Sequence, residues 1–181
     1  PQAASMVLYE VDSAARILAG LARNEVVELR ELDVGLRVRA DWPAALAAPA
    51  FERLGKLRLS VNGEEVGRLF EGARLPELVT LELGDDFPVE RLSCAGLRRL
   101  SLGGPLDSRS LAGLLERHPR LQTLRIWEMT VDEVNRALAI ALTLPSEHPL
   151  RVLALPTTNA DQELLGRARE RFGGDFYADE E

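Results

Sequence analysis

The stretch Leu121–Leu150 (LQTLRIWEMTVDEVNRALAIALTLPSEHPL) decides the fold of this chain. Its first six residues end with alternating apolar and polar side chains. This alternation is typical of a short strand with one buried face. A segment of helical period follows, and Thr130-x-x-Glu133 forms a capping box at its start. The apolar face of this segment holds Val134, Leu138, Ala141 and Leu142. At Leu150 the strand pattern begins again, so the stretch is one strand–helix unit that returns to a strand.

The strand pattern Leu-x-x-Leu-x-Leu, with aliphatic substitutes allowed, occurs six times. Its first positions are Leu29, Leu54, Leu78, Leu97, Leu121 and Leu150. They are 25, 24, 19, 24 and 29 residues apart, a period typical of repeat proteins. Segments of helical period, such as Leu111–Leu115 and Leu164–Phe172, separate several copies. Parallel strands joined by crossover helices predict a right-handed α/β solenoid, with the sheet on its concave face and helices on its convex face.

The chain divides into three parts on this interpretation. We expect residues 1–28 to form an N-terminal cap, with a helix over Asp12–Asn24 and one possible extra strand over Met6–Val11. Residues 29–158 hold the six repeats. Residues 159–181 form a C-terminal cap helix and an acidic tail, because a solenoid needs its ends covered.

Two features of the repeats lead to specific structural predictions. The 19-residue repeat that starts at Leu78 is too short for a full helix, so we expect an extended or 3₁₀ crossing from Phe87 to Cys94. The last helix begins with Asn159-x-x-Gln162, which we interpret as a looser capping box.

The six motifs LRELDV, LGKLRL, LVTLEL, LRRLSL, LQTLRI and LRVLAL resemble those of the leucine-rich repeat family, from Leu29 to at least Leu155. The longer copies are similar to the ribonuclease-inhibitor-like subclass and to irregular bacterial members. The family usually has Asn or Cys three positions beyond the motif, and only Asn62 fits. The other such positions are Arg37, Asp86, Pro105, Met129 and Thr158. The resemblance implies a module that binds a protein partner on the concave sheet.

Composition excludes several classes of function. The formal net charge of -7 argues against a nucleic-acid binder, because phosphate contacts need concentrated cationic surface. No apolar run is long enough to span a bilayer, so we expect no membrane partner. The absence of a signal peptide favours a cytoplasmic location, and the abundance of Ala, Leu and Arg indicates a GC-rich, bacterial genome. The chain begins at Pro1 and not at methionine, so the interpretation also allows for further sequence before it in the natural protein.

Charged side chains alternate in sign across the predicted concave face. Asp33, Arg58 and Glu82 occupy equivalent positions on successive strands, and Glu31 and Lys56 occupy the preceding ones. One interpretation is a cross-strand ladder of surface ion pairs that is neutral to partners. The other is a mixed-charge recognition surface, in which the arginines bind carboxylates of a partner through two hydrogen bonds.

Trp127 directly follows a strand motif, at a position where the earlier copies have serine or glycine. Tryptophan and arginine are enriched in interface hot spots, so Trp127 with Arg125, and Arg99 on the neighbouring strand, is the candidate contact centre. The alternative is that Trp127 packs over Met129 inside the loop.

The remaining reactive residue types have structural explanations. His118-Pro119 and His148-Pro149 each follow a helix, where a cation is favourable and proline ends the helix. Cys94 is the only cysteine and fits a small buried hydrophobe. No phosphate loop, nucleophile elbow or metal-ligand spacing occurs, so we expect no enzyme activity, no cofactor and no metal.

These observations predict a non-enzymatic module that binds an unidentified protein partner. The alternative is a segment of a longer or self-associating solenoid scaffold without a separate ligand. The oligomeric state is left open.

Overall fold

The structure is a computed structural model of the 181-residue chain. It describes residues 4–8, 16, 20, 29–34, 46–60, 70, 75–84, 88–104, 106–156 and 159–172. The chain divides into two compact units, unit 1 (Pro1–Leu97) and unit 2 (Arg98–Glu181), and we describe each unit by itself.

Unit 1 has parallel strands that are hydrogen-bonded in the order of the chain. They are β1 (Ala4–Leu8), β2 (Leu29–Val34), β3 (Lys56–Leu59) and β4 (Thr80–Leu83). Two 3₁₀ helices, η1 (Pro49–Phe51) and η2 (Val89–Arg91), lie in the connections that follow β2 and β4. The 3₁₀ crossing predicted for the short repeat is therefore confirmed by η2.

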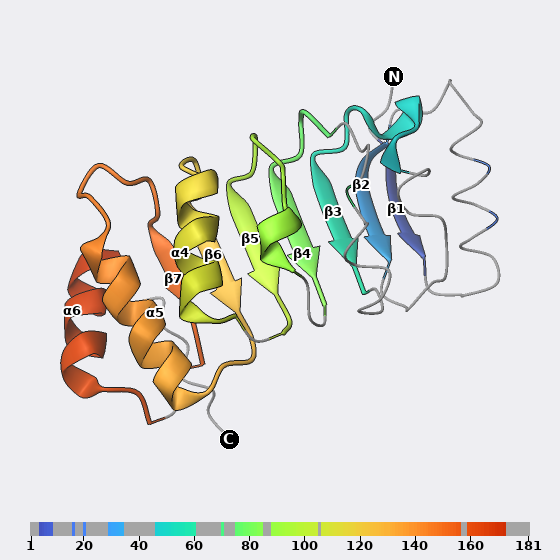
Figure 1. The fold of residues 1–181 in the computed structure, drawn as a ribbon. Coiled ribbons are helices and arrows are strands. Elements are labelled where there is room, and N and C mark those ends of the chain that lie inside the picture. Colours follow the sequence, from blue (N-terminus) through green and yellow to red (C-terminus); the bar gives the residue numbers. More distant parts are fainter. Residues whose placement is uncertain are drawn as a thin grey trace. The chain divides into compact units, whose positions relative to one another are not determined.

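Unit 2 combines parallel strands with longer helices. The strands are β5 (Arg99–Leu102), β6 (Thr123–Ile126) and β7 (Val152–Ala154), again paired in chain order. The helices are α4 (Ser108–Arg117), α5 (Val131–Thr143) and α6 (Gln162–Phe172). The helices lie on one side of the strands (Figure 1), and neighbouring helices pack on each other. The predicted α/β class with parallel strands is therefore confirmed.

The repeated leucines form the core, as the sequence pattern predicts. All three apolar positions of every copy, from Leu29 to Leu155, are at most 3% exposed. Each fully buried leucine contributes roughly 1.5–3 kcal/mol through removal of apolar surface from water. The polar residues between them point to the other face of the strands, because successive side chains of a strand alternate.

Backbone hydrogen bonds keep one register although the repeats differ in length. In unit 1 the carbonyl of Gly55 accepts from the N–H groups of Val79 and Thr80, at 2.9 and 3.0 Å. In unit 2 the carbonyl of Gln122 accepts from the N–H groups of Arg151 and Val152 in the same way, at 2.9 and 3.0 Å. These carbonyls belong to the second position of the motif. Differences in repeat length are therefore absorbed by the connections, and the strands stay aligned.

Helix caps explain where the helices of unit 2 begin. The Thr130 hydroxyl accepts from the N–H of Glu133 at 3.3 Å, and the Glu133 carboxylate accepts from the N–H of Thr130 at 2.8 Å. The predicted capping box of α5 is thus confirmed. α4 has Asp107 at its N-cap, where the carboxylate accepts from the N–H groups of Arg109 and Ser110.

The predicted cap of α6 is wrong. Asp161, and not Asn159, accepts from the first free N–H groups of the helix, those of Glu163 and Leu164, at 2.9 and 3.1 Å. Asn159 instead takes a left-handed backbone conformation with φ of 64°, which asparagine tolerates better than most residues. Asp161 is held in place because its own N–H donates to Oδ1 of Asn135 on α5 at 2.8 Å.

Some predictions fall on parts of the chain outside the described residues. Of the helix expected over Asp12–Asn24, only Arg16 and Gly20 are described, and both are helical. An extra strand was possible over Met6–Val11, and β1 covers Ala4–Leu8. Asn62, the one residue that fits the loop position of the resembled family, lies outside the described residues, as does the acidic tail.

Candidate functional site

Each unit has a sheet face that points away from its buried leucines, and we call it the open face. In unit 1 the strand register places Glu31, Lys56 and Thr80 in one row across β2, β3 and β4. The next row holds Asp33, Arg58 and Glu82. The sequence-predicted site residues of this unit therefore share one face, in the predicted order.

Arg58 lies between two carboxylates on this face. Its Nη1 atom is 3.4 Å from Oδ2 of Asp33, and its Nε atom is 3.6 Å from Oε2 of Glu82. These side chains are 32–56% exposed, so solvent screens the attraction and each pair contributes at most about 1 kcal/mol. The ladder of surface ion pairs is thus present. It pairs Arg58 with carboxylates of the protein itself.

Lys56 and Glu31 differ from this triad. They are register partners on β3 and β2, and both side chains are exposed. Among the described residues, neither makes an ion pair. They add one charge of each sign to the open face of unit 1, so they give it no preference for acidic or basic partners.

The open face of unit 2 carries positive charge only. Its first row is Arg99, Thr123 and Val152, and its second row is Ser101, Arg125 and Ala154. No outward position of β5, β6 or β7 is acidic. Within the described part of the chain, Arg99 and Arg125 have no carboxylate at ion-pair distance.

Ala154 is only 8% exposed. Its position alternates with those of the core, and this alternation predicts a solvent-facing side chain. It is the register partner of Arg125, whose side chain is much longer. The side chain of Ala154 is a single methyl group, so little of it is accessible to solvent beside such a long neighbour.

Arg125 is half-buried on this face. Its Nε atom is shielded from solvent, and no described residue accepts a hydrogen bond from it. A buried donor without an acceptor costs about 1–3 kcal/mol. Arg125 therefore has unused hydrogen-bonding capacity on this face.

Trp127 is the most exposed large apolar side chain of the described residues, at 59%. Its backbone N–H donates to the carbonyl of Leu102 at 3.0 Å, which extends the pairing of β5 and β6 by one residue. The strand before it therefore holds Trp127 in place while its indole lies on the surface. The alternative in which the tryptophan is buried in the loop is not supported.

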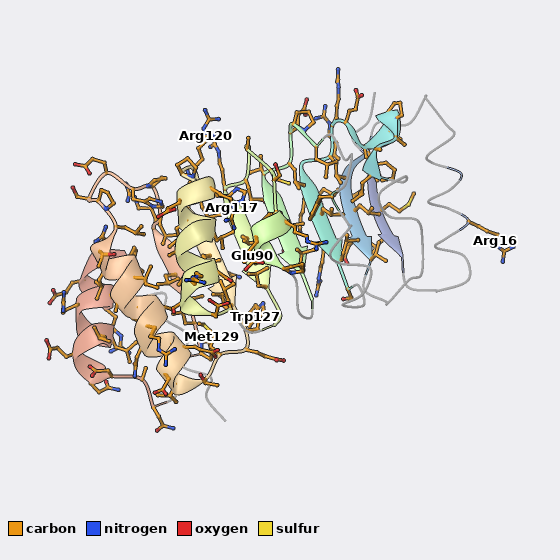
Figure 2. The ribbon with its side chains drawn as sticks, viewed as in Figure 1. Arg16, Glu90, Arg117, Arg120, Trp127 and Met129 are labelled. Atoms are coloured by element: carbon orange, nitrogen blue, oxygen red, sulfur yellow. The ribbon has the colours of Figure 1, made fainter. Side chains whose placement is uncertain are left out.

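Two residues that follow Trp127 closely in the sequence are also apolar and partly exposed. Met129 is half-buried, and Val131, the first residue of α5, is 39% exposed. Figure 2 shows Trp127 and Met129 at the C-terminal end of β6, whereas Arg117 and Arg120 lie at the C-terminal end of α4, beyond the other end of the strand. Val131 lies outside the strand motif, and the signal in the sequence that points to it is the apolar alternation of Trp127, Met129 and Val131.

Of the two histidine predictions, the one for His148 is wrong, whereas His118 is the C-cap of α4 as predicted. His148 does not cap α5, which ends at Thr143, and its Nδ1 accepts from the N–H of Leu150 at 3.2 Å. Burial lowers the pKa of His148, the Leu115 carbonyl opposes this effect, and the positive charges of Arg171 and Arg151 lower the pKa further. His148 is therefore a neutral acceptor in the turn before β7 and not a cation at a helix end.

Arg171 of α6 takes the place that the sequence analysis gave to a histidine. Its guanidinium donates to the carbonyls of Leu142, Leu144 and Pro145, at 2.8, 2.5 and 2.8 Å. These carbonyls lie at the end of α5, where no further helical N–H groups are available. No local sequence pattern predicts this contact, because it joins residues at least 26 positions apart.

Cys94 is buried, as predicted. Burial raises the pKa of its thiol to about 11, so the thiolate is scarce near neutral pH. The described residues include no group of three His, Cys, Asp or Glu side chains arranged to bind a metal. None of the described helices has the length and apolar character required to cross a bilayer.

No protein-family model and no curated protein matches the chain. Its function must therefore be inferred from the residues of the two open faces.

Proposed function

We propose that this chain is a non-enzymatic protein-interaction module built as a right-handed leucine-rich repeat solenoid. The proposed partner is a protein that binds the open sheet face. Support for the architecture comes from the six leucine motifs with uniformly buried apolar positions and from the constant strand register across repeats of unequal length.

One observation carries the functional part of the proposal. On the open face of unit 2, a 59% exposed tryptophan follows Arg125 by two residues, and neither Arg125 nor Arg99 has a carboxylate partner among the described residues. Tryptophan and arginine are among the residue types most enriched in the hot spots of protein interfaces. The open face of unit 1 is less suited, because Asp33 and Glu82 already occupy Arg58.

The experiment is affinity capture of proteins from the native host on immobilised protein. The double variant Arg125→Ala/Trp127→Ala is expected to lose a captured partner by at least about tenfold, because hot-spot residues contribute 2 kcal/mol or more. Its melting temperature is expected to stay close to that of the wild type, because both side chains are on the surface. Arg136→Ala on α5 is the control, since it removes one exposed positive charge from a helix. Unchanged capture by the double variant would reject the proposal.

The scaffold alternative has a separate test. Sedimentation velocity over a range of concentrations distinguishes a self-associating chain from a monomer that binds another protein. Self-association that Arg125→Ala/Trp127→Ala abolishes would replace the proposed partner by a second copy of the chain.

A further inference from the structure

The open face of unit 2 selects for the sign of a partner's charge. Its outward strand positions include two arginines and no acidic residue, within a chain of net charge -7. On unit 1 the corresponding arginine is neutralised by carboxylates at 3.4 and 3.6 Å. A complementary partner therefore brings its own carboxylates to Arg99 and Arg125.

Arg125 sets the geometry of that contact. Its Nε is shielded from solvent, so a partner reaches the two Nη groups, which offer two N–H groups side by side at the end of the guanidinium. A carboxylate accepts two parallel N–H bonds from this end. A neutral carbonyl satisfies only one of them, and an ammonium group is repelled.

The spacing of the three side chains defines the shape of the partner. Arg125 and Trp127 are two positions apart, which is about 6.6 Å along an extended chain. Arg99 is the register partner of Thr123, one strand away and two positions before Arg125. In an extended peptide, every second side chain points to the same face. Carboxylates at peptide positions one and three would therefore reach the two arginines. An apolar side chain at position five would cover Trp127.

We propose that the open face of unit 2 binds an extended acidic segment of a partner protein with the pattern acid-x-acid-x-apolar. This inference rests on the proposed function and adds the chemistry of the partner. The two carboxylates bind Arg99 and Arg125, and the apolar side chain packs on the Trp127 indole and the adjoining Met129 and Val131.

A nucleic acid fits this face less well. Nucleic-acid binding depends on many cationic contacts to phosphates, and the face supplies two. Exposed carboxylates of Glu128 and Asp132 lie close to Trp127 in the sequence and oppose a continuous polyanion. A short acidic segment needs only two cations, and its apolar residue at Trp127 carries no charge.

The experiment selects binders from a display library of random dodecapeptides on the immobilised full chain. We expect the enriched peptides to contain acid-x-acid-x-apolar, and synthetic copies to bind at least about tenfold more weakly to Arg125→Gln and to Trp127→Ala. Arg136→Gln is the charge-matched control and should bind like the wild type. Arg125→Lys keeps the charge but lacks the side-by-side donors, so binding should fall for it as well. Circular dichroism establishes that each variant is folded.

Other outcomes would overturn the inference. These are enrichment of neutral or basic peptides, acidic peptides that bind Arg125→Gln and wild type equally, no enrichment, or competition of a single-stranded oligonucleotide for the same face. If host-protein capture still depends on Arg125 and Trp127 in such a case, the proposed function stands and only the acidic chemistry fails. If capture does not depend on these residues, the proposed function itself fails.

Discussion

Arg125 on β6 is the register partner of Ser101 on β5, so its neighbour on that strand is a hydroxyl and not a carboxylate. On unit 1 the equivalent relationship joins Arg58 to Asp33 across β2 and β3. The same residue type on the same kind of face is thus satisfied internally in one unit and available in the other.

Replacing Ser101 with glutamate should convert Arg125 into a paired arginine. We expect Ser101→Glu to weaken partner binding by at least about tenfold, because the new carboxylate competes for the guanidinium. Stability should change by less than about 1 kcal/mol, since the pair is partly exposed. Binding is measured by titration with a captured partner or a selected peptide.

Ala139→Glu on the exposed surface of α5 is the control for net charge in this experiment. It should bind like the wild type. Equal weakening by both substitutions would show a long-range charge effect and not competition at Arg125.

Arg58→Gln should have the opposite profile, with a small loss of stability and no loss of partner binding. It leaves the carboxylates of Asp33 and Glu82 without their shared cation, which we expect to cost about 0.5–1 kcal/mol at low salt. The difference should shrink in about 0.5 M salt, because exposed charges are screened. Urea denaturation at two salt concentrations measures this effect, and Lys56→Gln is the comparison without an ion pair. A loss of partner binding in Arg58→Gln would mean that unit 1 also contributes to the interface.

Arg171→Met should destabilise unit 2 by about 2 kcal/mol, because three backbone carbonyls at the end of α5 lose a hydrogen-bond donor. The methionine keeps most of the apolar stem. Arg171→Lys should recover only part of the loss, since one ammonium group cannot reproduce the planar fork. The free energy of unfolding in urea is the measurement.

Arg167→Met on the exposed side of α6 is the matched control and should change stability little. An equal effect of Arg167→Met and Arg171→Met would contradict the assignment of Arg171 as the cap of α5.

His148 should make stability depend on pH in the mildly acidic range. Its folded pKa is below the ordinary value of 6.5, chiefly because of burial, so below about pH 6.5 the unfolded chain takes up a proton that the folded chain excludes. Stability therefore falls as the pH drops from 6.5 toward the folded pKa. His148→Asn keeps an acceptor for the N–H of Leu150 and should flatten this dependence. Urea denaturation from about pH 7 to 5 gives the free energy of unfolding of both proteins as a function of pH. Parallel curves of this free energy against pH would contradict the role of His148.

Local sequence determined much of the fold. The burial of Leu29, Leu124 and their equivalents follows from alternation, because strand side chains point to opposite faces with a period of two. The start of α5 follows from Thr130 and Glu133, which satisfy each other's backbone donors within one turn. Even the row of Asp33 and Arg58 is predictable, since repeated motifs align in register.

Contacts between distant segments could not be predicted in this way. The sequence offers both Asn159 and Asp161 as a cap for α6, and the hydrogen bond from Asp161 to Asn135 on another helix favours one of them. Similarly, the sequence leaves open whether an arginine lies free or binds backbone, and Arg171 binds carbonyls at least 26 residues away.

The sequence by itself determined which residues face the core and which face outward on each strand, because that choice depends on local periodicity. Only the tertiary structure decided which outward charges are already paired, because pairing depends on side-chain positions across neighbouring strands. Arg58 reaches two carboxylates there, whereas Arg125 has a buried Nε without a described acceptor and lies two residues from an exposed Trp127. That difference separates a neutral ladder from a candidate binding face.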